Sequence, residues 1–457
     1  MKGVKTDDEA TVRAPHSVTF AAPVLVGSSN SSTPDGSDFW FPGISIPTGI
    51  KGHVAQHITL AGDGTACPRP GHPGQSCEEI MITRDGGQSY TVAKKVQAGT
   101  SGNANGYGDL GTWVPAKKAE LAVLPAAGVF STIVGCNGCP RVHNASFWDF
   151  PAWLQTWKDD GTTLTIIKNV SVGFAGAPAS FSSKTSTCAG RRVCGFSSPS
   201  QTIIRTADDN LLLAVYGHAA DGWKNGSVYT TAYFSSSDQG LHWDYSSRID
   251  VTAATQTTGE EGPCEPAIVT LADGRVLTAL RHASGQPVWL AYSADHGRSW
   301  STPLPMSGQG ASGSAAGRAV ASVWPQLLVL ANGALVMSSG RPGVGLWVSS
   351  PKSDGAAWIG YDVCKEHNKL RPSDPYGSGS GTTSYTGLAE VEPGVLLLAY
   401  DKTGAERQGA VQKVYSMRIT IKTDDGALPM TPVSESGVEG GPRQLAAALS
   451  LTGATRW

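Results

Sequence analysis

Short apolar runs separated by polar turn residues are the main pattern along the chain. The stretch EPAIVTLADGRVLTALR places two such runs on either side of Asp273 and Gly274, and QLLVLANGALVMSSGR repeats this layout around Asn332 and Gly333. A further run, VLLLAYD, ends at Asp401. Runs of this length that are rich in Val, Ile, Leu, Thr and Tyr and are bounded by turn residues are typical of strands. The pattern therefore predicts an all-β protein.

Composition and charge limit the classes of partner. The chain has 457 residues, of which 40% are hydrophobic, so it is long enough for a substantial core. Its 56 glycines and 28 prolines can supply many turns. A net charge of -2 provides no general basic field, so neither nucleic acid nor an anionic membrane surface is an expected partner. We find no apolar run long enough to span a bilayer.

A turn motif recurs along the chain. Residues 83–90 (TRDGGQSY), 236–243 (SSDQGLHW) and 293–300 (SADHGRSW) share the frame Ser/Thr-x-Asp-x-Gly-x-x-aromatic. Weaker copies are WKDDGTTL at 157–164 and SDGAAW at 353–358. In a β-hairpin the Asp can accept hydrogen bonds from turn amides, the Gly can take a positive φ, and the aromatic residue can enter the core. The aspartates assigned to this role are Asp85, Asp159, Asp238, Asp295 and Asp354.

This motif resembles the Asp-box, or BNR repeat, of sialidases (neuraminidases) and related propellers. The resemblance implies a six-bladed β-propeller of four-stranded blades, because five boxes precede the strand region that follows Tyr385. We expect the propeller to cover residues 17–425. Residues 426–457 carry no repeat, so they are expected to form an irregular or packed-back C-terminal extension.

The same resemblance extends to a set of polar residues. Sialidases carry a glutamate before a strand, an arginine after the next hairpin, an arginine one blade later, and then a tyrosine just before an apolar strand. Glu265, Arg281, Arg341 and Tyr385 follow this order with similar spacing. The resemblance implies that Tyr385 is a nucleophile, that Glu265 takes its proton, and that Arg281 and Arg341 bind a substrate carboxylate.

The chemistry of sialic acid explains why a tyrosine would take this role. Its anomeric carbon carries a carboxylate, which repels a carboxylate nucleophile, and sialidases are an exception to the scheme of two catalytic carboxylates. A phenol with a pKa of about 10 is a poor nucleophile unless a neighbouring base takes its proton. The sequence therefore predicts a shared pocket for these four residues. His218 and His282 are further candidates to line it, without an assigned role.

Two positions depart from the family pattern. The first family arginine stands in an Arg-Ile-Pro motif, whereas this chain has Ser45 before Ile46 and Pro47. Loss of one charge-assisted contact to a buried carboxylate costs on the order of 1.5 to 3 kcal/mol, about ten- to a hundredfold in affinity. Ser45→Arg is therefore expected to improve binding, unless another side chain already fills that space.

The second departure concerns the acid/base residue. The family aspartate that precedes the first Asp-box has no clear match in AGDGTACPRPGHPGQSCEEIMITRDGG. The candidates in this interval are Asp63, His72 and Glu78.

Three functions remain compatible with these residues. The first is an exo-acting glycoside hydrolase that cleaves terminal sialic acid or a related carboxylate-bearing sugar. The second is a uronate lyase in which Tyr385 acts as acid or base and the arginines neutralise a carboxylate. The third is a non-catalytic propeller that binds glycans or protein. Glu265 would have no evident use in a lectin, so the sequence favours the hydrolase, with a sialoglycoconjugate or acidic saccharide as partner and without a cofactor or metal ion.

Eight cysteines and four glycosylation sequons favour a secretory route. We expect local disulfides between Cys67 and Cys77 and between Cys188 and Cys194. Cys136 and Cys139 have the spacing of a strained disulfide or of half a zinc site, but no second half is present. Cys264 and Cys364 pair at long range or stay free. The sequons are at Asn30, Asn144, Asn169 and Asn225.

The N-terminus, MKGVKTDDEA, lacks the apolar segment of a signal peptide. We therefore expect that a leader has been removed; otherwise the secretory interpretation is wrong.

Overall fold

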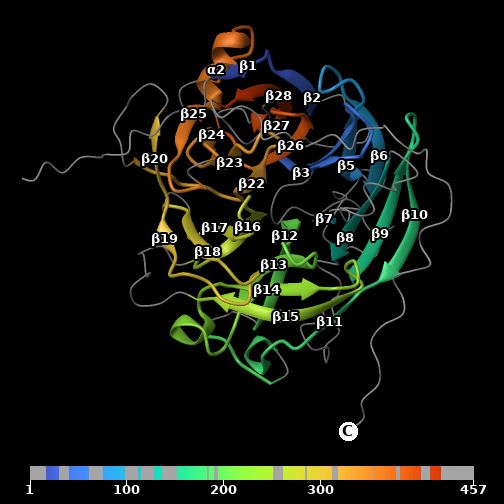
Figure 1. The fold of residues 1–457 in the computed structure, drawn as a ribbon. Coiled ribbons are helices and arrows are strands. Elements are labelled where there is room, and N and C mark those ends of the chain that lie inside the picture. The colour runs from blue at the N-terminus through green and yellow to red at the C-terminus, as the bar shows by residue number, and fades with distance from the viewer. Residues whose placement is uncertain are drawn as a thin grey trace, which may run out of the picture.

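The computed structural model describes residues 17–29, 41–60, 76–97, 112–114, 128–135, 152–182, 185–189, 194–250, 261–283, 286–310, 318–351, 354–376, 381–402 and 412–423. Within these ranges the chain forms mainly strands, which Figure 1 shows as sheets arranged around a central axis. The predicted all-β, six-bladed β-propeller is confirmed. Residues 426–457 lie outside the described residues.

The strands follow the chain around the ring. Blade 1 contains β3 (Phe41–Pro47), β4 (Val54–Thr59), β5 (Ser76–Thr83) and β6 (Thr91–Gln97). Blade 2 contains β7 (Thr112–Val114), β8 (Val129–Gly135), β9 (Ala152–Asp159) and β10 (Leu164–Ser171). Blade 3 contains β12 (Gly195–Arg205), β13 (Leu211–His218), β14 (Thr230–Ser236) and β15 (His242–Ile249), with β11 (Gly173–Ala175) parallel to β15.

Blade 4 contains β16 (Cys264–Thr270), β17 (Val276–Arg281), β18 (Trp289–Ser293) and β19 (Leu304–Pro305). Blade 5 contains β22 (Gln326–Val329), β23 (Leu335–Gly340), β24 (Val344–Ser349) and β25 (Ile359–Asp362), with β20 (Ser307–Gly310) and β21 (Arg318–Ala319) at its outer edge. Helix α2 (Val363–Leu370) follows β25, and two short 3-10 helices, η2 (Ala179–Phe181) and η3 (Trp223–Gly226), lie in the loops of blade 3.

Blade 6 joins the two ends of the described chain. It contains β26 (Thr386–Glu392), β27 (Val395–Lys402) and β28 (Lys413–Lys422). Strands β1 (Ser17–Phe20) and β2 (Val24–Ser28) both pair antiparallel with β28. The ring is therefore closed by backbone hydrogen bonds between its first and last strands.

Apolar packing between blades explains why several strands are continuous apolar runs. All residues of β17 are buried, and so are all but the last residue of β27. Because both faces of a middle strand are covered by neighbouring blades, alternation of polar and apolar residues is not needed there. For example, Leu396 and Leu398 of β27 belong to the same buried cluster as Val336, Leu346 and Val348 of blade 5.

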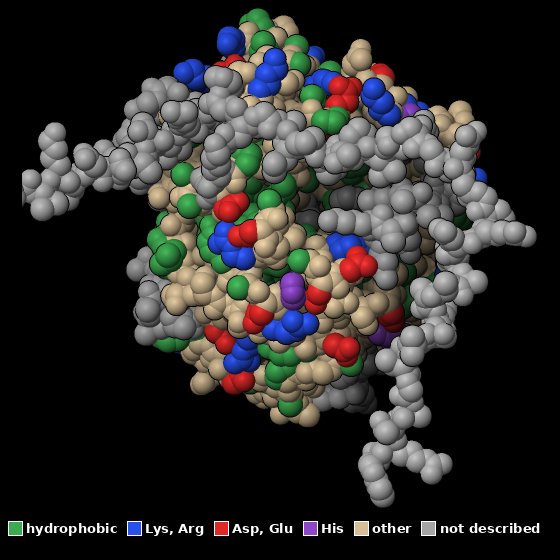
Figure 2. All heavy atoms as spheres, viewed as in Figure 1, with side chains coloured by type: hydrophobic (Ala, Val, Ile, Leu, Met, Phe, Trp, Pro, Cys, Tyr) green, Lys and Arg blue, Asp and Glu red, His purple; other side chains and the backbone are tan. Residues whose placement is uncertain are grey.

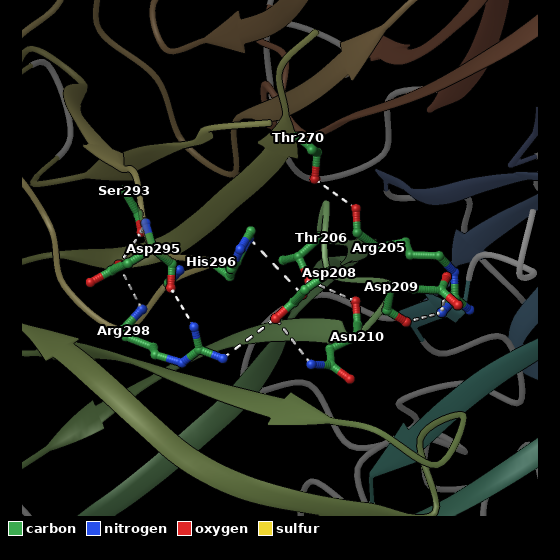
Figure 3. Close-up of polar contacts among 11 residues, drawn as sticks. Arg205, Thr206, Asp208, Asp209, Asn210, Thr270, Ser293, Asp295, His296 and Arg298 are labelled. Atoms are coloured by element: carbon green, nitrogen blue, oxygen red, sulfur yellow. Dashed lines mark hydrogen bonds and ion pairs between the residues drawn. The ribbon is translucent and has the colours of Figure 1, made fainter. Parts of the chain in front are cut away.

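The hairpin that carries Asp295 has the conformation expected of an Asp-box. Asp295 accepts hydrogen bonds from Ser293 Oγ at 2.8 Å and from the backbone N–H of Arg298 at 3.1 Å (Figure 3). Gly297 has a φ of 87°, which favours glycine. Equivalent bonds from turn amides are accepted by Asp85 and Asp238.

The copy of the turn motif at 157–164 differs from the expected hydrogen bonding. At 157–164 the turn amides of Thr162 and Thr163 donate to Asp160. Asp159 is buried and accepts from the backbone N–H of Gly161 at 3.0 Å and from Thr48 Oγ1 at 2.7 Å. Asp159 therefore takes only part of the box role, because the strands already pair at Asp159 and Leu164 and the later amides reach Asp160. Asp354, with a φ of 45°, occupies the position directly before the turn glycine.

Polar contacts between hairpins of neighbouring blades are solvent-exposed. Arg298 Nη2 lies 3.4 Å from Asp208 Oδ2 of blade 3, as Figure 3 shows. Arg275 Nη2 of blade 4 lies 3.2 Å from Asp354 Oδ2. Exposed ion pairs of this kind contribute little to stability, so apolar packing between the blades holds the ring together. Acidic and basic side chains are mixed over the face in Figure 2, in agreement with the small net charge.

One predicted local pairing is confirmed. Cys188 and Cys194 form a disulfide, and Cys77 is also disulfide-bonded. Cys264 and Cys364 are free thiols. The other three cysteines named above, Cys67, Cys136 and Cys139, lie outside the described residues.

The sequons at Asn169 and Asn225 are exposed, and those at Asn30 and Asn144 lie outside the described ranges. Among the residues that the structure describes, no cluster of three or more His, Cys, Asp or Glu side chains is arranged to hold a metal ion. No helix in the same part of the chain is long and apolar enough to cross a membrane.

Candidate active site

Tyr385 and Glu265 meet near the axis of the ring. Tyr385 directly precedes β26 of blade 6, and Glu265 is the second residue of β16 of blade 4. The innermost strands of the blades approach one another there (Figure 1), and the Tyr385 hydroxyl donates to Glu265 Oε1 at 3.3 Å. The structure therefore places a phenol beside a carboxylate, as the sequence predicted, although the two residues lie on different blades.

Glu265 is buried and held from two further directions. Its side chain is 8% exposed. Arg281 Nη1 donates to Oε1 at 2.6 Å, and the backbone N–H of Trp324 donates to Oε2 at 2.8 Å. The antiparallel register of blade 4 pairs Cys264 with Arg281, which brings the arginine to the neighbouring glutamate. These donors orient the carboxylate toward Tyr385.

Arg281 contacts a second carboxylate. Its Nη2 lies 2.6 Å from Oε2 of Glu261, while the Arg281 side chain itself is only 9% exposed. Burial alone would lower the pKa of Arg281, but the carboxylates of Glu265 and Glu261 raise it above its usual value. Arg281 therefore stays charged in this environment.

Arg341 adjoins the loop that carries Tyr385. Its Nη2 donates to the carbonyl oxygen of Thr383 at 3.1 Å. Asp401 holds the same loop, because it accepts from the backbone N–H of Thr383 at 2.8 Å and from Thr382 Oγ1 at 2.9 Å. Complete burial raises the pKa of Asp401 to about 6. All four predicted residues therefore lie in one connected network.

Two aromatic side chains flank the tyrosine. Phe41, the first residue of β3, stacks on Tyr385 with ring centroids 4.6 Å apart and an interplanar angle of 23°. The Trp324 ring is tilted, with its centroid 5.8 Å from that of Tyr385. Aromatic faces of this kind commonly support sugar rings and lower the local dielectric constant. Sequence reasoning missed both residues, since neither belongs to the family pattern.

Backbone strain is concentrated around this network. Glu265, Trp324, Arg341 and Ser384 have φ values of 41°, 45°, 60° and 68°. Each such residue costs on the order of 1–3 kcal/mol, and such strain persists mainly where a site requires it. Other described residues with positive φ, such as Gln239 and His296, lie in hairpin turns. Four residues with positive φ therefore lie in and beside the network of Tyr385 and Glu265.

Ser45 does not face an empty position in an arginine clamp. The side chain is 6% exposed and its hydroxyl donates to Gln56 Oε1. Gln56 Nε2 in turn donates to the carbonyl oxygen of Gly43 at 3.1 Å. A Cβ added at Gly387 of blade 6 would collide with Ser45 Oγ. Gln56 and blade 6 therefore fill that space, which is the exception under which Ser45→Arg was not expected to improve binding.

Of the three acid/base candidates, the structure describes Glu78. Asp63 and His72 lie outside the described residues. Glu78 lies on β5, the third strand of blade 1, where it is fully buried and accepts from His57 Nε2 at 3.0 Å. Glu78 is thus held inside a blade, which does not suit a group that exchanges protons with a substrate.

The two histidines have local roles. His218 Nδ1 donates to the carbonyl oxygen of Gly226 at 3.0 Å, and the ring stacks on Tyr229 with a centroid separation of 4.4 Å. His282 is buried, so its pKa is lowered, and its ring lies 5.7 Å from that of Trp289. These contacts fit structural side chains of blades 3 and 4.

Comparison with known proteins supports the fold. Residues 191–400 match the BNR repeat-like domain. A protein of unknown function from Dyadobacter fermentans superposes with a TM-score of 0.56 at 13% identity, covering 89% of this chain and 99% of that chain. No curated protein sequence matches the chain.

Two enzymes of known class share the same architecture. The Hadza microbial sialidase Hz136 gives a TM-score of 0.50 at 13% identity, covering 86% of this chain and 68% of that chain. The GH93 alpha-L-arabinofuranosidase of Fusarium graminearum, in complex with arabinobiose, gives a TM-score of 0.50 at 13% identity, covering 88% and 98%. Residues 191–400 are thus similar to the BNR repeat-like domain, and the described chain shares the β-propeller fold of these structures.

Proposed function

We propose that the chain is an exo-acting glycoside hydrolase that cleaves terminal sialic acid or a related carboxylate-bearing sugar. The observation that carries this proposal is the 3.3 Å hydrogen bond from the Tyr385 hydroxyl to Glu265 Oε1. A sialidase and an arabinofuranosidase among the similar structures support the glycosidase class. The partner is then a glycan with an accessible terminal residue.

In the first step Glu265 Oε1 accepts the phenolic proton while the Tyr385 oxygen attacks the anomeric carbon. The bond to the leaving oxygen breaks, and a general acid protonates that oxygen. In the second step the same group, now a base, activates water, which releases the sugar from Tyr385, and Glu265 returns the proton to the phenol oxygen. We retain Asp63 and His72 as candidates for this acid/base.

Arg281 and Arg341 supply the positive charge for a substrate carboxylate. Arg341 adjoins Tyr385 through Thr383, and Arg281 is linked to Glu265. A guanidinium group presents paired donors that match a carboxylate. The Cys188–Cys194 disulfide and the exposed sequons at Asn169 and Asn225 support a secretory location.

The proposal is tested with a fluorogenic aryl sialoside. Wild-type protein should release the reporter alcohol, Tyr385→Phe should abolish turnover, and Glu265→Gln should slow it by about a hundredfold or more, because a general base contributes roughly 10²- to 10⁴-fold. Tyr361→Phe is the matched control: it removes a hydroxyl from β25 of blade 5 and should leave turnover unchanged. Circular dichroism checks that all variants are folded.

Two other outcomes would replace the proposal. Growing ultraviolet absorbance on a uronate polymer, without release from the sialoside, would identify the lyase. Glycan binding without turnover in either assay would identify a lectin.

A further inference from the structure

Arg281 is bracketed by two carboxylates of the protein itself. Nη1 contacts Glu265 Oε1 and Nη2 contacts Glu261 Oε2, each at 2.6 Å. A substrate carboxylate bound by Arg281 would need donors of the same guanidinium group. The Nη2 that would donate to it already contacts Glu261.

The two carboxylates differ in how firmly they are held. Glu265 is 8% exposed and receives additional hydrogen bonds from the Trp324 backbone and the Tyr385 hydroxyl. Glu261 is 41% exposed, and the carboxylate contact that the structure gives it is the one to Arg281. Its backbone is anchored separately, since its carbonyl oxygen accepts from the N–H of Tyr229 at 2.7 Å. Glu261 can therefore release Arg281 by a side-chain rotation.

The charge of Arg281 is compensated without a ligand. Glu261 and Glu265 each place a carboxylate oxygen 2.6 Å from its guanidinium group. An anionic sugar would therefore approach an arginine whose positive charge is already compensated. Like-charge repulsion from an exposed carboxylate would act directly on the incoming anion.

We propose that Glu261 is a specificity-determining residue that competes with anionic sugars for Arg281. This inference rests on the proposed function. In the wild-type protein a substrate carboxylate displaces Glu261 from Nη2 before it binds, which weakens the binding of anionic sugars. A neutral terminal sugar does not need this contact and is bound without that competition.

The test uses Glu261→Gln, which keeps the size of the side chain but removes its charge. Titration calorimetry measures binding of 2,3-didehydro-2-deoxy-N-acetylneuraminic acid, an unreactive anionic sugar. The variant should bind about tenfold more tightly than the wild type, which is the effect of one charge-assisted contact. In the aryl sialoside assay the gain should appear as a lower KM.

Glu392→Gln is the matched control. Glu392 is 40% exposed and pairs with Arg418 Nη2 at 3.0 Å, so the same change removes a comparable ion pair. It lies at the opposite end of β26 from Tyr385 and should leave the affinity unaltered. Glu261→Ala, which removes the whole carboxylate, should reproduce the gain.

Equal affinity of Glu261→Gln and wild type for the anionic sugar would overturn the inference, and so would an equal gain in Glu392→Gln. An absence of anionic-sugar binding in all variants would overturn it as well. Failure of the proposed function gives a different result. The proposed function fails if wild-type protein releases no reporter, or if Tyr385→Phe still releases it. Neither result depends on the measured affinities for the anionic sugar.

Discussion

Ser45→Arg tests how closely blades 1 and 6 pack. Ser45 is 6% exposed and lies between Gln56 of β4 and Gly387 of β26, where even a Cβ on Gly387 would collide with Ser45 Oγ. An arginine side chain at this position has no room without displacing one blade from the other. The substitution should therefore destabilise the ring instead of completing an arginine clamp.

The size of the effect follows from three contributions. Overpacking of a filled core costs about 1–3 kcal/mol. Loss of the Ser45 hydroxyl leaves Gln56 Oε1 without its donor, which costs about 1–3 kcal/mol. A guanidinium group that is buried without a partner adds a penalty of its own. A total of roughly 3–6 kcal/mol is a large fraction of the 5–15 kcal/mol typical of folded domains.

Urea denaturation followed by fluorescence measures this loss against two references. Ser45→Ala removes only the hydroxyl and should lose about 1–3 kcal/mol. Ser45→Thr keeps the hydroxyl but adds a methyl group at a buried position, so its loss should be smaller than that of Ser45→Arg. The reasoning is refuted if Ser45→Arg unfolds within about 1 kcal/mol of wild type and also binds the anionic sugar more tightly. That result would mean that the side chain at position 45 reaches Tyr385.

Three further predictions concern stability. The pKa of Asp401 is raised from 3.8 to about 6, so its protonated carboxyl group stabilises the folded state. This contribution to the free energy of unfolding is fully present below pH 3.8 and is lost as the pH rises through about 6. Between pH 4 and pH 7 the free energy of unfolding of the wild type should fall by up to about 3 kcal/mol, and that of Asp401→Asn should not show this fall. Parallel plots of unfolding free energy against pH for the two proteins would contradict this. Asp295→Ala should lower the free energy of unfolding by about 1–2 kcal/mol in urea, since it removes the acceptor of the turn amides. Cys188→Ser with Cys194→Ser should lower it by about 2 kcal/mol, because the disulfide closes a short loop; unchanged Tm values would contradict either prediction.

Local sequence signals were sufficient for the fold. The turn motif at Asp85, Asp238 and Asp295 depends on short-range hydrogen bonds between a carboxylate and amides three and four residues later, so its structure is readable from a few consecutive residues. The copy at 157–164 fits the Asp-x-Gly frame through Asp159, yet the amides of Thr162 and Thr163 donate to Asp160. The frame does not reveal that the strands already pair at Asp159 and Leu164, which shortens the turn.

The site was predictable only in part. Glu265, Arg281, Arg341 and Tyr385 follow a family order, so the resemblance was enough to place them together. The contacts of Trp324 and Phe41 arise from the meeting of different blades, which leaves no periodic signal in the chain.

The surroundings of position 45 could not be predicted for a related reason. Whether a side chain there faces the axis or a neighbouring blade depends on a register shift between β3 and β4 near Pro42 and Ser45. One sequence does not reveal such a shift. Glu261 lies only four residues before Glu265, yet its link to Arg281 depends on a loop path that pattern analysis does not specify.

The pairing of β1 and β2 with β28 has a consequence for biosynthesis. A ribosome delivers β1 first, but its partner strand ends at Lys422, so the N-terminal strands must wait until nearly the whole ring has been translated. During that interval their unpaired edges are exposed, and β28 of a second nascent chain offers the same hydrogen-bonding pattern. Polysomes that carry several such chains therefore favour strand exchange between neighbours, and chaperone shielding of residues 17–28 would increase the yield of monomer.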